Sequence, residues 1–342
     1  MCSSDLKNVK FIPYLGAYSD DSFGIDQSGN LIPYKKYNKL MPEQQVKLLC
    51  LWDELGIPHE ERKQTWGAPL TIIGIDVDPN KMMLSLPPDR QTDLIAELRK
   101  FCLTTPRRRG ASFSLREWQR LAGWVNWGLN AYPLLRPALN RVYPKMAGED
   151  QPLRKIWVNN AVRADLTWAA DHLENLFGVQ LLHSQQWPVN DADIVVYCDA
   201  CLDGLGCWFP DHGVGFYAHI PHWAPSDIIF YFEALSVAMA LDHLTHVTAP
   251  LSKILIYTDN ANTVSIFNSL RCLPVFNPLI KHCADILITK GYLLRVCFVP
   301  GEDNKVADAI SHKNFPLAKS LSPGLQIGLL MPPRFKLGVA EK

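Results

Sequence analysis

The sequence predicts an α/β (α+β) chain, in which a mixed N-terminal part and a helical middle part precede a mixed sheet with flanking helices. Over roughly 88–180, apolar residues recur at helical spacing. From Asp193 onward, three short strand patterns separated by Gly-containing turns are followed by alternating helix and strand patterns. Hydrophobic residues make up 48% of the 342 residues and charged residues 20%, which indicates a folded chain rather than a disordered one.

Residues 1–87 are predicted to form a first, mixed α/β region. Pro42 suits the first turn of a helix and Gly56 ends the apolar pattern, which predicts a helix over about 42–55. Residues Leu70–Val77 are predicted to be one strand, and Lys81–Leu86 a second strand.

Residues 88–189 are predicted to form a helical region. One helix is expected over about 88–102 and another over about 152–176. Between them, Ser114 and Glu117 have the spacing of a capping box, in which each side chain satisfies an exposed amide of the other residue. Residues 316–342 contain Pro, Lys and Leu without a clear period, so we expect a loosely ordered tail.

Residues 190–315 are predicted to form the mixed sheet with its helices. The strand patterns are Ile194–Cys198, Cys207–Phe209, Gly215–His219, Ile254–Thr258 and Leu293–Val299, and the helical patterns cover about 230–246, 261–270 and 278–289. A three-stranded meander followed by βα units is typical of a mixed sheet.

The bulk composition favours an intracellular protein of the cytoplasm or nucleus. The chain has 34 basic and 34 acidic residues, and this balance neither indicates nor excludes a nucleic-acid partner. The nine cysteines are scattered, and the single CxxC motif, Cys198 to Cys201, is a weak zinc signal, so reduced thiols are expected. No run approaches 18 apolar residues, so we expect no membrane partner.

Four carboxylates occur where a shared site would need them. Asp199 and Asp259 each follow an apolar strand pattern directly, so both are expected at one edge of the sheet if the strands are neighbours. Glu233 shares a helix face with Val237, at i+4, and therefore projects from the apolar side. Asp308 lies among small and apolar residues at a helix start.

Four converging carboxylates would repel one another and raise each other's pKa unless cations neutralised them. Oxygen ligands of this kind select Mg²⁺ or Mn²⁺, and two such ions about 4 Å apart can cleave a phosphodiester. Taken singly, each acid would more often be a helix cap, a turn former or a surface residue. The four positions together favour a metal site.

The motifs around these acids resemble the ribonuclease H domain of retrotransposon polyproteins, over roughly 190–315. They are YCDA with two following glycines, FEAL, YTDN and VPGEDN through ADAIS, in the order that the family shows. The resemblance implies that Asp199, Glu233, Asp259 and Asp308 are catalytic residues that bind two Mg²⁺ ions, with Mn²⁺ as a substitute. The implied substrate is RNA in an RNA/DNA hybrid. His312 stands where retrotransposon sequences usually have arginine.

The N-terminal part resembles a reverse transcriptase. Tyr18-Ser19-Asp20-Asp21 is similar to the hairpin that presents an aspartate to the polymerase metals, and 114–143 resembles the thumb and connection regions. The resemblance is to retroelements, of the type that integrates with a tyrosine recombinase, and it implies other polyprotein segments as partners. Residues 1–87 would then be a partial palm and 88–189 the helical thumb and connection.

The palm is expected to be incomplete. Only seventeen residues precede Tyr18, too few for the fingers and for the strand that carries another catalytic aspartate. Asp20 and Asp21 are therefore interpreted as a vestigial polymerase site in an N-terminally truncated chain. We expect no primer extension by this chain alone.

A group of arginines is a candidate contact for the hybrid's phosphates, with a solvated basic loop as the alternative. These arginines are Arg107, Arg108, Arg109, Arg116 and Arg120.

The leading hypothesis is endonucleolytic hydrolysis of RNA in RNA/DNA hybrids by a two-metal carboxylate site. One alternative is a non-catalytic remnant that binds nucleic acid. The other is a reverse transcriptase that a missing N-terminal region would complete.

Overall fold

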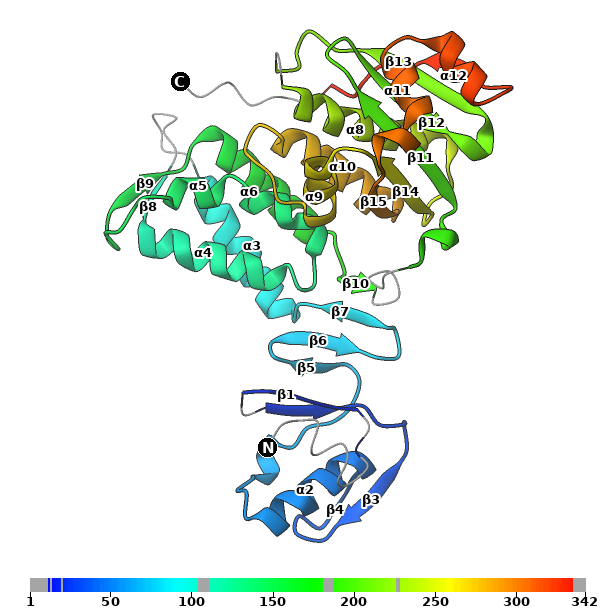
Figure 1. Cartoon of the computed structure of the whole chain (residues 1–342). Helices are drawn as coiled ribbons and strands as arrows, with labels where there is room; N and C mark the ends of the chain where they lie inside the picture. Colours follow the sequence, from blue (N-terminus) through cyan, green and yellow to red (C-terminus); the bar gives the residue numbers. More distant parts are fainter. Residues whose placement is uncertain are drawn as a thin grey trace. The chain divides into compact units, whose positions relative to one another are not determined.

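The computed structural model describes residues 12, 14–19, 21–103, 111–180, 187–225 and 228–334. The chain forms two compact units, Met1–Pro87 and Pro88–Lys342 (Figure 1). The fold is α/β with a mixed multi-stranded sheet flanked by helices, which confirms the fold class expected from the sequence.

The first unit consists of hairpins, a small meander and one long helix. Its elements are β1 (Leu15–Tyr18), β2 (Asp21–Gly24), β3 (Leu31–Tyr34), β4 (Lys39–Pro42), α2 (Glu43–Leu55), η1 (Glu61–Lys63), β5 (Leu70–Ile72), β6 (Ile75–Asp78) and β7 (Met83–Ser85). Strand β1 pairs antiparallel with β2 and β3 with β4. Val46 and Leu49 of α2 pack on Tyr34 and Met41 of the second hairpin. The helix expected over 42–55 is confirmed.

The single strand expected over Leu70–Val77 is wrong. Strands β5 and β6 form a hairpin in which Ile72 pairs with Ile75. The two residues between them have positive φ, 51° at Ile73 and 78° at Gly74, as a two-residue hairpin turn requires. An isoleucine at such a position gives no turn signal, so the run looked continuously apolar.

The second unit begins with a helical segment. Its elements are α3 (Pro88–Cys102), β8 (Ser112–Ser114), α4 (Leu115–Gly128), η2 (Pro133–Leu139), α5 (Val142–Met146), β9 (Lys155–Trp157), α6 (Asn160–Leu173) and β10 (Val179–Gln180). The capping box is confirmed: the hydroxyl of Ser114 accepts from the amide of Glu117, and a carboxylate oxygen of Glu117 accepts from the amide of Ser114 at 2.8 Å. The helix expected over 152–176 begins later, at Asn160, because Lys155–Trp157 pairs with β8 as a strand.

The rest of this unit is a six-stranded mixed sheet of order β15-β14-β11-β12-β13-β16, with helices on both faces. Its strands are β11 (Ile194–Ala200), β12 (Gly204–Phe209), β13 (Val214–His219), β14 (Lys253–Thr258), β15 (Leu293–Phe298) and β16 (Gln326–Leu329). Its helices are η3 (Val189–Asp191), η4 (Pro210–His212), α8 (Ile229–Val247), α9 (Ala261–Ser269), α10 (Asn277–Lys290), η5 (Gly301–Asp303), α11 (Lys305–Ser311) and α12 (Phe315–Leu321). Strands β11 to β13 are antiparallel, whereas β14 runs parallel to β11 and β15 parallel to β14.

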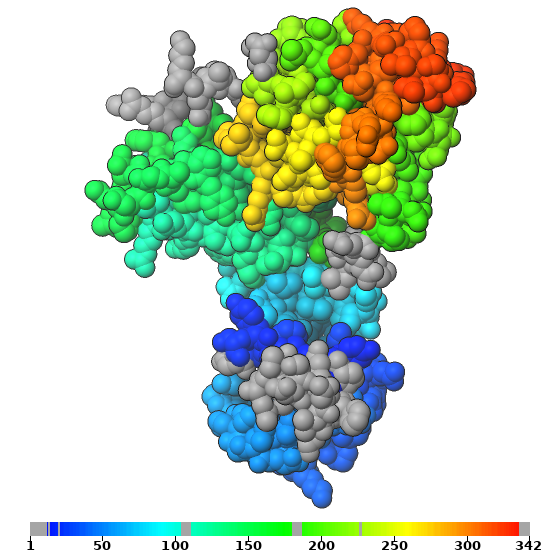
Figure 2. Space-filling view, viewed as in Figure 1, coloured from blue at the N-terminus to red at the C-terminus, as the bar shows by residue number. Residues whose placement is uncertain are grey.

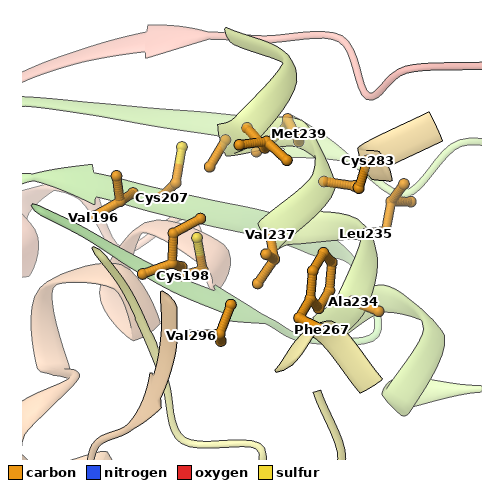
Figure 3. Close-up of a cluster of buried hydrophobic side chains, with 14 of the residues drawn as sticks. Val196, Cys198, Cys207, Ala234, Leu235, Val237, Met239, Phe267, Cys283 and Val296 are labelled. Carbon is orange, nitrogen blue, oxygen red and sulfur yellow. The ribbon is translucent and has the colours of Figure 1, made fainter. Parts of the chain in front are cut away.

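The main core lies between the sheet and α8. Cys198 and Cys207, from two neighbouring strands, point toward Val237 and Met239 of this helix (Figure 3). Burying such side chains contributes roughly 25 cal/mol per Å² of apolar surface, so this layer stabilises the packing of α8 on the sheet. Because successive strand residues point to opposite faces, Asp199 lies on the other face of the sheet from Cys198.

The tail expected over 316–342 is wrong for its first part. Helix α12 covers Phe315–Leu321, and β16 then pairs parallel with β13, Val214 opposite Gln326. In the space-filling view, the red atoms of this segment lie against the green atoms of the sheet (Figure 2). Ala318 and Leu325 are buried against Ile310, and such sparse apolar positions gave no periodic signal in the sequence.

The helical segment and the sheet belong to the same compact unit. Buried polar contacts join the two parts. Asp165 of α6, which is fully buried, accepts hydrogen bonds from Arg141 (3.2 Å), from Lys281 of α10 (3.0 Å) and from Asn277 of α10 (2.8 Å).

Candidate metal centre

Two parallel strands position the first pair of acids. Asp199 is the penultimate residue of β11, and Asp259 follows β14 directly. These strands pair in register, with Tyr197 opposite Tyr257, so continuing the register places Asp199 level with Asp259. The sequence-based expectation that both acids meet at one sheet edge therefore matches the observed topology.

Helix α8 brings Glu233 to the same place. The side-chain oxygens of Asp199, Glu233 and Asp259 lie within 4.8 Å of one another. Ligand atoms of Asp199, Asp308 and His312 form a second group of the same compactness, and Asp199 belongs to both. The structure thus brings together the four acids singled out in the sequence.

Burial makes the ionised forms of these acids unfavourable. Asp199 is 4% exposed and Glu233 is 6% exposed. Burial, opposed by a hydrogen bond from Ser311 and reinforced by Asp259 and Asp308, raises the pKa of Asp199 to about 7. Burial, together with Asp199 and Asp259, raises the pKa of Glu233 to about 9. Burial also raises the pKa of Asp259, and Asp308 raises it further.

The donor set fits divalent cations. One oxygen of Glu233, Oε2, is buried and has no hydrogen-bond partner among the described residues. A buried carboxylate oxygen without a partner costs several kcal/mol, and a cation held between the acids would remove that cost. Clustered carboxylate oxygens are the ligands that Mg²⁺ and Mn²⁺ prefer.

Two residues that were not assigned a role in the sequence orient Asp199. The hydroxyl of Ser311, on α11, lies 2.6 Å from Asp199 Oδ2. The side-chain amide of Asn304 donates to the carbonyl of Cys198 at 3.0 Å and lies 3.5 Å from Asp199 Oδ1. Both residues lie in the motif that ends in Ser311, but nothing in a linear motif shows which strand its side chains reach.

His312 also lies beside the acids, although the sequence analysis gave it no role in the site. Its Nδ1 lies 3.5 Å from Asp308 Oδ1 and 3.1 Å from the carbonyl oxygen of the same residue. In the sequence it stood out only as a departure from the usual arginine. The structure places its imidazole beside one acid of the cluster, and both side chains are 55% exposed.

Two glycines of β12 let α11 approach the sheet. A Cβ built on Gly206 would lie 2.5 Å from the carbonyl oxygen of Ala307 and 2.7 Å from the amide of Ser311. A Cβ on Gly204 would lie 2.4 Å from the carbonyl oxygen of Ser311. The absence of side chains at these positions therefore allows α11 to carry Asp308 up to Asp199.

Gly206→Ala is expected to destabilise the protein by about 1–3 kcal/mol, because the new methyl group meets helix backbone that must shift. It should also weaken Mg²⁺ binding, since Asp308 moves with α11. Gly123→Ala is the control: Gly123 lies within α4 with nothing near its Cβ position, so the substitution should be neutral or stabilising. Urea unfolding and calorimetric Mg²⁺ titration measure both effects. Equal stability of the two variants would contradict the tight α11 contact.

The metal-free protein is expected to lose stability as pH rises. Asp199 and Glu233 have folded pKa values of about 7 and about 9, above the ~4 expected when unfolded, so the folded state binds more protons between those limits. Their contribution is fully present below about pH 4 and is lost progressively through about pH 9. The loss should be on the order of several kcal/mol in EDTA, and Mg²⁺ should remove most of it. Urea unfolding across this pH range measures the free energy of unfolding. The prediction would be contradicted if that free energy changed with pH in the same way with and without Mg²⁺.

The remaining candidate residues lie elsewhere or outside the described residues. Asp20 falls outside them, and so do Arg107, Arg108 and Arg109. Asp21 is exposed at the start of β2, opposite Tyr18 of β1. Arg116 and Arg120 lie on α4, away from the sheet strands that carry the acids, and Arg120 donates to Glu97 at 3.0 Å.

Comparisons with known proteins give structural likenesses alone. No family model and no curated protein matches the chain. RNase H1 from the halophilic archaeon Halobacterium salinarum NRC-1 is 12% identical, with a TM-score of 0.29, and the match covers 36% of this chain and 97% of that one. LC11-RNase H1, solved in complex with an RNA/DNA hybrid, is 19% identical, with a TM-score of 0.31, over 38% of this chain and all of that one (100%).

A foamy viral protease-reverse transcriptase, solved in complex with dsDNA, is similar over a longer part of the chain. It is 14% identical with a TM-score of 0.38, and the match covers 87% of this chain and 57% of that one. At these identities and TM-scores the likenesses do not assign a function, which has to be inferred from the acids themselves. In the part of the chain that the structure describes, no helix is long and apolar enough to cross a membrane.

Proposed function

We propose that this chain is an endonuclease of the ribonuclease H type, which hydrolyses RNA in RNA/DNA hybrids with the help of two Mg²⁺ ions, or Mn²⁺ in their place. The observation that carries the proposal is the convergence of Asp199, Glu233 and Asp259 from three separate elements, with Asp308 beside Asp199. No other cluster of described acids is both this compact and this buried. The motif resemblance to retrotransposon polyproteins supports the same activity and suggests that other polyprotein segments are its partners.

Asp199, Glu233 and Asp259 would hold one cation, and Asp199 with Asp308 would hold the other. When bound, such a pair of ions supplies a nucleophilic water and neutralises the charge that develops on the leaving oxygen. The chain's own contribution is to fix its carboxylates before substrate arrives. Ser311 orients Asp199, and the amide of Ala200 donates to Glu233, so neither carboxylate has to reorganise.

The test is cleavage by the purified chain of a labelled RNA/DNA hybrid, with duplex DNA, duplex RNA and single-stranded RNA as the comparison substrates. We expect Mg²⁺-dependent internal cuts in the RNA of the hybrid, abolished by EDTA and restored by Mn²⁺. Binding of the hybrid without cleavage in either metal would favour a non-catalytic remnant instead.

A further inference from the structure

Two arginines lie on neighbouring segments, η2 and the loop that joins α9 to α10, which hydrogen bonds from Asn140 and Arg141 hold together. Arg136 lies in η2 and is partly buried, and Arg271 lies in the loop and is exposed. Burial lowers the pKa of Arg136, and the positive charge of Arg271 lowers it further. The phenol of Tyr143, which is 50% exposed, also lies within electrostatic range of Arg136.

Buried polar contacts hold the pair in place. The side-chain amide of Asn140, just after η2, donates to the carbonyl of Leu270 at 3.0 Å and to Asn277 Oδ1 at 2.9 Å. Arg141 donates to the carbonyl of Pro274 at 3.1 Å. The loop carrying Arg271 is therefore clamped onto η2 on both sides of that residue.

Neither guanidinium has a carboxylate partner within the described ranges of the chain. Arg141, five residues after Arg136, differs in this respect because Asp165 neutralises it. Two fixed positive charges without a counter-ion repel each other, and an external anion would relieve that repulsion. Planar guanidinium groups match the oxygens of a phosphate, to which they can donate two hydrogen bonds at once.

Helix α9 links Arg271 to the acids along the chain. Helix α9 begins beside Asp259, with Asn260 as its N-cap, and Arg271 follows the end of the helix. Nine helical residues span about 14 Å, which is about four nucleotides of a strand. The same substrate could therefore reach both places.

We propose that Arg136 and Arg271 form a phosphate-binding site for the backbone of a polynucleotide, about four nucleotides from the bond that the acids cleave. The position of the scissile bond rests on the proposed function, whereas the binding of a phosphodiester backbone rests on the arginine pair. None of the arginines singled out in the sequence belongs to this site.

Hybrid binding by the full chain tests the proposal, measured by fluorescence anisotropy over a range of salt concentrations. The variants are Arg136→Gln, Arg271→Gln and the double variant, all in an Asp259→Asn background that prevents cleavage. Each lost contact should lower the slope of log K against log salt by about one, so the double variant should lose about two. Arg154→Gln is the matched control, because Arg154 is 58% exposed and is paired with Glu149 at 3.0 Å; its slope should stay within about half a unit of the parent's.

The cleavage kinetics give a second readout. With Asp259 intact, the double variant should raise KM at low salt and leave kcat within about twofold, because a phosphate contact remote from the reacting atoms contributes uniform binding. Hybrids cut too short to reach the pair should be cleaved equally well by the variant and by the wild type. If Arg136→Gln unfolds, as its partial burial allows, the exposed Arg271→Gln alone retains both readouts.

The outcomes separate the two proposals. A double variant with wild-type affinity and salt slope, in a chain that does cleave hybrids, would overturn the phosphate site and leave the nuclease standing. If the chain bound hybrids through these arginines but never cleaved them, the nuclease would be overturned and the phosphate site would stand. A wild-type chain that binds no polynucleotide would overturn both.

Discussion

Asp259→Asn is expected to reduce metal-dependent hybrid cleavage by more than about 100-fold while the protein stays folded. Substituting a residue that only orients a metal ligand already lowers metal affinity or activity by about 10–100-fold. Loss of the charge of a ligand itself should therefore lower the activity more. Within the described part of the chain, the Asp259 carboxylate has no side-chain hydrogen-bond partner. Its removal should therefore relieve repulsion in the metal-free state, and the variant should be at least as stable as the wild type in EDTA.

Cleavage rates and thermal melts with and without Mg²⁺ measure this pair of effects. Asp303→Asn is the matched control, because Asp303 is exposed in the nearby η5 loop and is outside the acid cluster. It should keep both the activity and the Mg²⁺-dependent rise in melting temperature. If Asp259→Asn cut hybrids at the wild-type rate, the assigned site would be wrong.

Asp165→Ala is expected to destabilise the second unit by about 3–5 kcal/mol. It removes the counter-ion of Arg141 and Lys281, whose side chains are 14% and 16% exposed, and it leaves the amide of Asn277 without its acceptor. Burial raises the pKa of Asp165, and the two cations oppose that shift. Because the network joins α6 to α10, unfolding should remain a single transition at lower urea concentration.

The control for this substitution lies on the same helix. Asp171 is 61% exposed and pairs with Arg99 at 2.6 Å, so Asp171→Ala should cost no more than about 1 kcal/mol. Urea unfolding followed by tryptophan fluorescence measures both variants. Similar losses in the two would mean that the buried network contributes little to stability.

The acid cluster could be predicted from the sequence because each acid is fixed by its own short pattern. Asp199 and Asp259 follow apolar strands, and Glu233 shares a face with Val237, so local periodicity places each acid at a strand end or on an apolar helix face. Because four such positions occur in the order of a known motif, few interpretations other than a shared metal site remained.

The residues that the sequence did not reveal depend on partners far along the chain. Asp165 is ordinary in its helix until Arg141 and Lys281 are known to reach it, across gaps of 24 and 116 residues. The electrostatic interaction of Arg136 with Arg271 is of the same kind. The turn at Ile73 was missed for another reason, since its positive φ is imposed by the hairpin and not by the side chain.

Strand β16 has a consequence for self-association. Without it, β13 would be the outer strand of the sheet and would present a row of unpaired amides and carbonyls, a template on which a second chain can add. The strand that covers it has four residues and is followed by Pro332 and Pro333, which have no N–H to donate. A shortened protein that ended at residue 315 would therefore keep all four acids and yet be prone to dimerise or aggregate through β13.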